Sequence, residues 1–201
     1  MSNKTEVINR ALIKIGANTI ASPDEASEQA RKALIVFETV AQNEMRRHIW
    51  NFAKTRATLA PLASPPGGGD FNYGFNLPGD CLRLVSLNGN WVFQSIREGS
   101  DDALPYFTIE GRTLLTNDGS AAIVYIADKS ADVPLWDAAF VEAFACRLAA
   151  ELVQSIAKNM TLKTDLKNDY KAALQEAKRT NAIELPPQVI ADGSWVLARY
   201  W

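Results

Sequence analysis

His48 is the only histidine of the 201-residue chain and the first side chain to consider for acid–base chemistry. A catalytic histidine needs a nucleophile or an orienting acid beside it, and the sequence offers no recognisable set of this kind. His48 also continues an apolar stripe through Phe37, Ala41 and Met45 at helical spacing. We therefore expect a packed, hydrogen-bonded side chain at the end of a helix.

Two polar or flexible stretches invite a functional interpretation that their context disfavours. The triple glycine at 67–69 lacks the GK[ST] ending of a phosphate-binding P-loop and follows prolines instead of a strand, so it predicts a mobile surface loop. Asp101 and Asp102 are adjacent carboxylates, but neighbouring residues of a strand or loop point apart. They follow Gly99 and Ser100, which favours a solvated loop tip.

Glu142 is the acid that a hydrolase would require. On a helix its predicted angle lies among apolar neighbours, and glycoside hydrolysis needs a buried acid near a second carboxylate. A contact between subunits explains Glu142 equally well. Two cysteines, Cys81 and Cys146, are too few for a disulfide framework. Cys146 is expected to be a buried, reduced thiol, and the chain is expected to be synthesised in a reducing cytoplasm. We predict no catalytic, cofactor-binding or metal-binding residues.

The segment 134–158 is the helix that the rest of the chain must surround. At ~100° per residue its polar side chains form one narrow seam, and most of the remaining circumference is apolar. The seam consists of Arg147, Glu151, Gln154 and Lys158. A helix that is apolar over so much of its surface must be buried by other elements on several sides.

Three further helices are expected, near residues 5–16, 23–48 and 161–182. Gly16 can supply a left-handed C-terminal cap to the first, and Ser22-Pro23-Asp24-Glu25 has the form of a capping box for the second. The last helix follows segment 134–158 after a loop of a few residues, which predicts an antiparallel helical hairpin.

The central part of the chain changes to a strand pattern. Residues 50–59 and 121–127 read as strands, and hairpins are expected at Asn88-Gly89-Asn90 and Glu110-Gly111-Arg112. The strands after Trp50 and before Asp128 should lie close together, because they flank the inserted β-rich region. The predicted fold is α+β: a bundle of about four helices from residues 1–60 and 128–183, an inserted β-rich region at 61–127, and an extended C-terminal arm at 184–201.

The charge and hydropathy of the chain exclude several classes of protein. A net charge of −2 and a pI near 5.5, with basic residues interleaved with acids, disfavour a dedicated nucleic-acid binder. Isolated basic pairs such as Arg46-Arg47 are typical of solvated faces. No apolar run approaches the ~20 residues of a membrane span, and the first residues lack the apolar core of a signal peptide.

The arm at 184–201 is the segment without a partner in the helical pattern. Pro186-Pro187 ends helical structure and favours an extended chain. Aromatic side chains are the usual anchors of interfaces. We predict that the arm docks on a partner protein or on a neighbouring subunit through Trp195, Val196, Leu197, Tyr200 and Trp201.

Four stretches together resemble the head-to-tail adaptor (connector) family of tailed bacteriophages, the group that includes the tail tubular protein A of short-tailed phages. They are Ile8-Asn9-Arg10-Ala11-Leu12-Ile13-Lys14-Ile15-Gly16, His48-Ile49-Trp50-Asn51-Phe52-Ala53 running into Arg56-Ala57, Leu77-Pro78-Gly79-Asp80-Cys81-Leu82-Arg83-Leu84, and the alanine-rich pair Leu148-Ala149-Ala150-Glu151-Leu152 and Tyr170-Lys171-Ala172-Ala173-Leu174-Gln175-Glu176-Ala177. Their order and spacing extend over nearly the whole chain.

The resemblance implies a non-enzymatic virion protein, synthesised in the bacterial cytoplasm and located at the head–tail junction. Family members assemble as a ring, usually dodecameric, beneath the portal, extend the DNA channel and present a platform for the next tail or nozzle protein. Double-stranded DNA passes through without specific binding, which suits a mildly acidic chain because each neutralised phosphate adds affinity. The alternative is a tail-associated peptidoglycan hydrolase built on Glu142.

Overall fold

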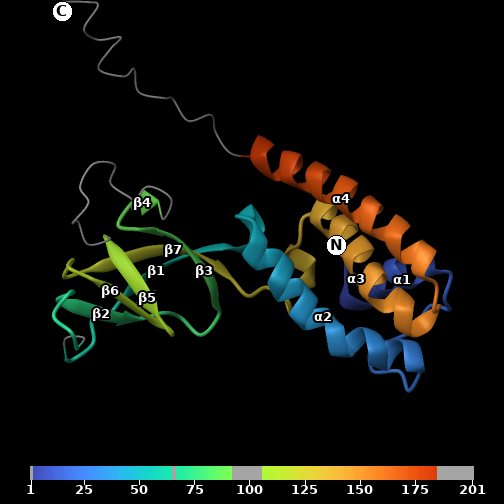
Figure 1. The fold of residues 1–201 in the computed structure, drawn as a ribbon, viewed down its shortest axis with the longest axis horizontal. Coiled ribbons are helices and arrows are strands. Elements are labelled where there is room, and N and C mark those ends of the chain that lie inside the picture. The colour runs from blue at the N-terminus through green and yellow to red at the C-terminus, as the bar shows by residue number, and fades with distance from the viewer. Residues whose placement is uncertain (1, 65–66, 92–105, 185–201) are drawn as a thin grey trace, which may run out of the picture.

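The computed structural model describes residues 2–64, 67–91 and 106–184, in which a helical lobe and a β lobe lie end to end (Figure 1). Four α-helices and two small antiparallel sheets make up these lobes, which confirms the α+β class. No helix among the described residues is long and apolar enough to cross a membrane.

Helix α1 (Lys4–Ile15) has the boundaries that its caps dictate. The side chain of Asn3 accepts a hydrogen bond from the backbone N–H of Glu6, and Gly16 adopts the left-handed conformation (φ 76°) expected of a C-terminal cap. Asn9 then holds the following loop, because its side chain donates to the carbonyl of Ile20 at 2.9 Å and accepts from the same residue's N–H at 2.8 Å.

Helix α2 (Glu28–Arg47) begins five residues later than the sequence predicts, so the proposed capping box at Ser22 is wrong. Ser22 and Glu25 instead close a separate turn, in which the Glu25 carboxylate accepts from the N–H of Ala21 at 2.8 Å. The side chain of Ser27 caps the helix by accepting from Ala30. Ser22 and Ser27 could each cap the helix, but Ser22 belongs to the preceding turn and Ser27 caps α2.

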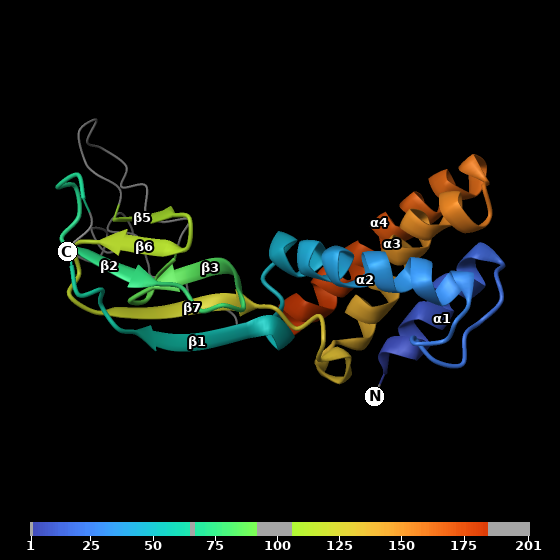
Figure 2. The same ribbon diagram turned by 90° about the horizontal axis from the view of Figure 1, so that it is seen from below.

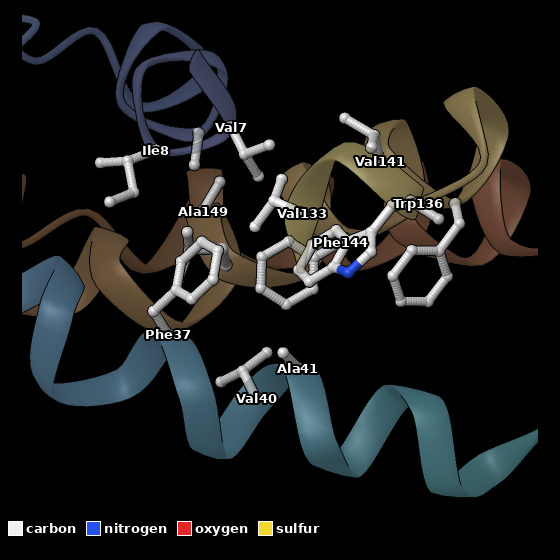
Figure 3. Packing of buried hydrophobic residues seen from close by; sticks show 14 of the residues in the cluster. Val7, Ile8, Phe37, Val40, Ala41, Val133, Trp136, Val141, Phe144 and Ala149 are labelled. Carbon is white, nitrogen blue, oxygen red and sulfur yellow. The ribbon is translucent and has the colours of Figure 1, made fainter. Parts of the chain in front are cut away.

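Helix α3 (Ala138–Ile156) is the buried helix of the fold, as its apolar circumference predicts. It packs against α1, α2 and α4, and Figure 3 shows α1 and α2 on two sides of the aromatic cluster around Phe144. The start predicted at Pro134 is wrong by four residues, because Val133–Leu135 forms a short 3₁₀ turn (η3) and Asp137 supplies the N-cap. The predicted polar seam holds: Arg147 is partly exposed and Glu151, Gln154 and Lys158 are exposed.

Helix α4 (Met160–Ile183) lies along α3 and completes the predicted helical hairpin. The side chain of Asn159 caps it by accepting from Leu162, and Lys158 makes the tight reversal at a φ of 53°. Its buried residues are Leu166, Ala177 and Asn181, with Leu162, Ala173 and Leu174 partly buried against the helical core.

One sheet of the β lobe has the strand order β1-β7-β3-β4. Its strands are β1 (Lys54–Leu59), β3 (Cys81–Leu87), β4 (Asn90–Trp91) and β7 (Ala121–Ala127). β1 and β7 pair from Lys54↔Ile126 to Leu59↔Ala121, so the strands that flank the insertion are adjacent as predicted. The strand predicted from Trp50 begins only at Lys54, because Asn51–Ala53 forms a 3₁₀ turn (η1). β1 is therefore part of the β lobe although it precedes residue 61.

The second sheet has the order β2-β6-β5, with β2 (Tyr73–Asn76), β5 (Phe107–Glu110) and β6 (Thr113–Thr116). Both predicted hairpins are confirmed, with positive φ at Asn88 and Gly89 in one and at Gly111 in the other. The two sheets form two layers around a small apolar core (Figure 2). That core contains Phe75, Leu84, Leu87, Phe107, Leu114, Ala121, Ile123, Tyr125 and Ala127.

Strand β7 joins the two lobes because its two faces serve different cores. Ile123 and Tyr125 belong to the core between the sheets, whereas Ile126 belongs to the helical core, with Val85 of β3 beside it. The alternation of side chains along a strand permits this arrangement. The β lobe is therefore packed onto the end of the helical lobe as well as connected to it.

Candidate functional site

A pocket of about 620 Å³ opens at the junction of the two lobes. The end of α2, the start of β3 and the middle of α3 contribute its walls. Its lining residues are Asn43, Glu44, Arg46, Arg47, Arg83 and Arg147. Four guanidinium groups therefore surround one carboxylate, and arginine keeps its charge at any physiological pH.

Glu44 is the buried centre of this pocket, with only 3% of its surface exposed. Its carboxylate accepts a hydrogen bond from the Tyr170 hydroxyl at 2.6 Å and another from Arg47 Nη1 at 3.1 Å. Arg147 Nε lies 3.3 Å from Glu44 Oε1, and Arg147 Nη2 lies 2.7 Å from Glu151. A buried carboxylate is tolerated only when it is paired and hydrogen-bonded, and Glu44 meets both conditions.

The charges in this network alter the ionisation of their neighbours. Burial, followed by the hydrogen bond to Glu44 and its negative charge, raises the pKa of Tyr170 well above its ordinary value of 10.0. The negative charge of Glu44 likewise raises the pKa of Arg47. Tyr170 is thus a neutral hydrogen-bond donor at physiological pH, and the Arg147 guanidinium lies over its ring at 5.9 Å.

Arg46 and Arg83 close the opposite wall by a reciprocal contact between α2 and β3. Arg46 Nη1 donates to the carbonyl of Leu82 at 2.6 Å, and Arg83 Nη1 donates to the carbonyl of Arg46 at 3.3 Å. Both acceptors are backbone carbonyls. The pair also ties the β lobe to the end of α2.

A second set of hydrogen bonds fixes the chain just after the pocket. Trp50 Nε1 donates to the carbonyl of Glu44 at 3.0 Å. Asn51 and Asn181 bond reciprocally, because the Asn51 N–H reaches Asn181 Oδ1 at 2.7 Å and Asn51 Nδ2 reaches the Asn181 carbonyl at 2.9 Å. Asn181 also donates to the carbonyl of Ile49 at 3.0 Å. The end of α4 is thereby fastened to the link between α2 and β1.

His48 occupies the position that its apolar stripe predicts. It caps the C-terminus of α2, is partly buried, and packs edge-on against Trp50 with ring centroids 4.8 Å apart. Burial, followed by the charges of Lys178 and Arg83, lowers the pKa of His48 and favours the neutral ring. The predicted hydrogen bond is not found among the described residues.

Glu142 does not lie in an apolar environment, and this expectation is corrected. Its side chain is 45% exposed and pairs with Lys14 at 2.6 Å and Arg10 at 3.9 Å, both from α1. Long basic side chains of α1 reach over the helix and neutralise the carboxylate. Cys146 beside it is buried as predicted, and burial raises the pKa of its thiol although the positive charge of Lys14 acts to lower it.

The other candidates lie at the surface or outside the described residues. Gly67–Gly69 is exposed, and Gly68 and Gly69 have positive φ in a turn. Asp101 and Asp102 lie outside the described residues. So do the predicted partner-binding residues Trp195, Val196, Leu197, Tyr200 and Trp201.

Sequence reasoning missed Glu44, a buried acid on α2. A signal was present, because Glu44 falls next to Met45 and seven residues after Phe37, on the apolar stripe of α2. An acid at such a position requires a buried cation. The partners Arg147 and Tyr170 come from α3 and α4, so no local pattern indicates them.

Replacing Tyr170 with phenylalanine should lower the free energy of unfolding by about 1–3 kcal/mol at pH 8, because the buried Glu44 loses a hydrogen-bond donor. The Tyr170 hydroxyl has a raised pKa in the fold, so the stability it confers is complete below pH 10 and falls as the pH rises above that value. Urea denaturation of both proteins at pH 8 and pH 11 should show the difference shrinking. An equal difference at both pH values would contradict this.

No protein-family model matches the chain, and no curated protein matches it either.

Proposed function

We propose that the chain is a structural subunit of a tailed-bacteriophage virion, a head-to-tail adaptor that forms a ring beneath the portal. In this role it extends the channel for DNA and connects the capsid to the next tail or nozzle protein. The resemblance of four stretches to the adaptor family is the starting point. The arrangement of those stretches in space is the observation that carries the proposal.

Three of the four stretches meet at the junction pocket although they are far apart in the chain. Trp50 of the second stretch bonds to the Glu44 carbonyl, Leu82 of the third accepts from Arg46, and Tyr170 of the fourth donates to the Glu44 carboxylate. The remaining stretch forms α1 and packs against α3. The Arg46–Leu82 bond joins the two lobes, and the other contacts hold the end of α2 to α4 and to the link that follows α2.

A subunit between a capsid and a tail must transmit force without bending. The junction suits this demand, because Arg46 of α2 and Arg83 of β3 make reciprocal contacts across it, and Asn51 just before β1 bonds to Asn181 of α4. An elongated subunit whose lobes lie end to end provides separate ends for the portal and for the tail (Figure 2).

The charge of the chain supports passage of DNA rather than its retention. The net charge is −2, and the arginines of the junction surround a buried glutamate in a pocket instead of following a continuous basic stripe. A channel lined with unpaired lysine or arginine would hold DNA through its phosphates in a salt-dependent manner. We therefore expect no specific complex with double-stranded DNA.

The arm at 184–201 supplies the proposed contact with the portal. Deleting residues 187–201 should leave the melting temperature of the free protein nearly unchanged, because the helical core is built from residues 7–177. The deletion should abolish attachment to the portal protein of the same phage, because it removes the predicted aromatic anchors. Calorimetry and size-exclusion chromatography with purified portal measure the two effects.

A variant of full length separates loss of the anchors from loss of the arm. Trp195→Ser, Tyr200→Ser and Trp201→Ser together should abolish attachment as the deletion does. A much lower melting temperature for the truncated protein would show that the aromatic residues belong to its own core. A wild-type chain that attaches to no portal would refute the adaptor function.

A further inference from the structure

Strand β1 is the outermost strand of its sheet in the part of the chain that the structure describes. One side of it pairs with β7 over the whole length of the strand, without a bulge, from Lys54↔Ile126 to Leu59↔Ala121. No described strand pairs with the other side, the outer edge of β1, which follows the outside of the β lobe (Figure 2). A regular edge of this kind presents backbone N–H and C=O groups to which an extended segment can bond.

The core between the two sheets is incompletely covered at this edge. Ala57 and Leu59 of β1 pack against that core, yet both remain partly exposed, and no residue of β1 is buried. In the neighbouring strand β7, by contrast, Ile123 and Tyr125 of the same core are buried. A further strand at the outer edge would cover Ala57 and Leu59 with its own side chains.

The end of α4 brings the C-terminal arm to the start of this edge. Asn51 lies in the turn that precedes β1, and its side chain donates to the Glu184 carboxylate at 3.0 Å and to the Asn181 carbonyl at 2.9 Å. Glu184 is the last residue that the structure describes. The arm therefore leaves the helical lobe beside the first residues of β1.

The first part of the arm has the sequence of a short strand. Pro186-Pro187 keeps the chain extended, and Gln188-Val189-Ile190-Ala191 follows with two β-branched residues and no charge. Two chains that run side by side from the Asn51–Glu184 contact advance almost equally, which places residues 188–191 beside residues 55–58. Asp192-Gly193 then favours a bend, so the strand would end there.

Other occupants of the outer edge are less suitable. The segment between Trp91 and Tyr106 is attached elsewhere, because β4 lies at the opposite edge of the sheet and the Tyr106 hydroxyl bonds to Asp118. Strand β1 of a second copy would bring Lys54 and Arg56 against like charges. The arm of the same chain is tethered a few residues away, so its effective concentration exceeds that of an arm from another molecule.

We propose that residues 188–191 of the arm dock on the outer edge of β1 in the same subunit, as an additional strand parallel to it. The bend at Asp192-Gly193-Ser194 then lies at the far end of β1, and residues 195–201 remain available for a partner. The inference does not depend on the adaptor function, because it concerns the free chain. It specifies the surface on which the subunit holds its own arm.

Hydrogen exchange of the free protein, followed for individual residues by nuclear magnetic resonance, tests this strand. The N–H groups of β1 that point away from β7 should exchange about tenfold faster or more when the arm strand is lost. Val189→Pro/Ile190→Pro removes two successive N–H donors, one of which faces β1 in any register. This variant and deletion of residues 187–201 should accelerate exchange equally, while unchanged exchange in β3 and β7 shows that the fold is intact.

Two controls locate the contact in the arm and in the molecule. Val196→Pro/Leu197→Pro makes the same kind of change beyond the bend and should leave exchange in β1 as in the wild type. Dilution of the wild type separates its own arm from that of another molecule. Protection within one subunit does not change on dilution, whereas protection by a second copy does.

Three results would overturn the proposal. They are equal exchange of β1 in the wild type and in Val189→Pro/Ile190→Pro, an equal acceleration by Val196→Pro/Leu197→Pro, and protection that disappears on dilution. The last would assign the outer edge of β1 to the arm of a second copy. No portal protein enters these measurements, so their failure leaves attachment to the portal to be tested separately, and a chain that attaches to no portal can still pass them.

Discussion

Replacing Phe144 with alanine should lower the free energy of unfolding by about 3–5 kcal/mol, as large-to-small changes in a core do. Phe144 is 1% exposed in the middle of α3 and contacts Phe37 and Trp136 edge-on, with ring centroids 5.1 Å and 4.9 Å apart. Alanine would remove these contacts and leave a cavity that three packed helices cannot close. Urea denaturation followed by circular dichroism measures the change.

Ile35→Ala provides the control for Phe144→Ala. Ile35 lies on α2 and is 77% exposed, so its replacement should change the stability by no more than about 0.5 kcal/mol. A loss below about 1 kcal/mol for Phe144→Ala would mean that this side chain faces outward, contrary to the central position of α3.

Replacing Glu44 with alanine should destabilise the protein by about 2–5 kcal/mol, because it leaves two partly buried polar groups without their acceptor, at about 1–3 kcal/mol each. The partly buried Arg147 would lose its partner at 3.3 Å, and the Tyr170 hydroxyl would lose its acceptor at 2.6 Å. Glu44→Gln retains an acceptor for the hydroxyl and should cost less than Glu44→Ala. Thermal and urea denaturation of the two variants give the comparison.

Glu151→Ala is the matched control for Glu44→Ala, since Glu151 also pairs with Arg147 but on the surface. Exposed ion pairs contribute little, so this change should cost about 0–1 kcal/mol. Equal losses for Glu44→Ala and Glu151→Ala would show that the pocket is open to water and that Glu44 is not its structural centre.

Local patterns in the sequence determine most of the secondary structure of this protein. The apolar circumference of 134–158 predicts a helix enclosed by others, and the stripe through Phe37, Ala41 and Met45 predicts the buried face of α2. Asn88-Gly89 predicts the hairpin turn, because few other residues adopt positive φ at two successive positions. These features depend on residues close together in the chain, so they can be read without the fold.

The boundaries of an element are less predictable where two nearby residues could each begin it. Ser22 and Ser27 are both suitable N-caps, and the helix starts at the second because Asn9 and Glu25 hold the preceding loop in a turn. Strand β2 was not predicted as a separate strand. Its four residues from Tyr73 to Asn76 are too short for a periodic signal and become a strand through pairing with β6.

Only the tertiary structure decided the composition of the junction. Glu44, Arg83, Arg147 and Tyr170 come from four elements, and the chain brings them together because α3 and α4 pack beside α2 while β3 returns to its end. The packing of α1 against α3 places Glu142 beside Lys14, so that an expected buried acid is a partly exposed ion pair. Periodicity specifies which face of an element is apolar, but the partner of a polar side chain on that face depends on which segments meet there, and that is a property of the whole fold.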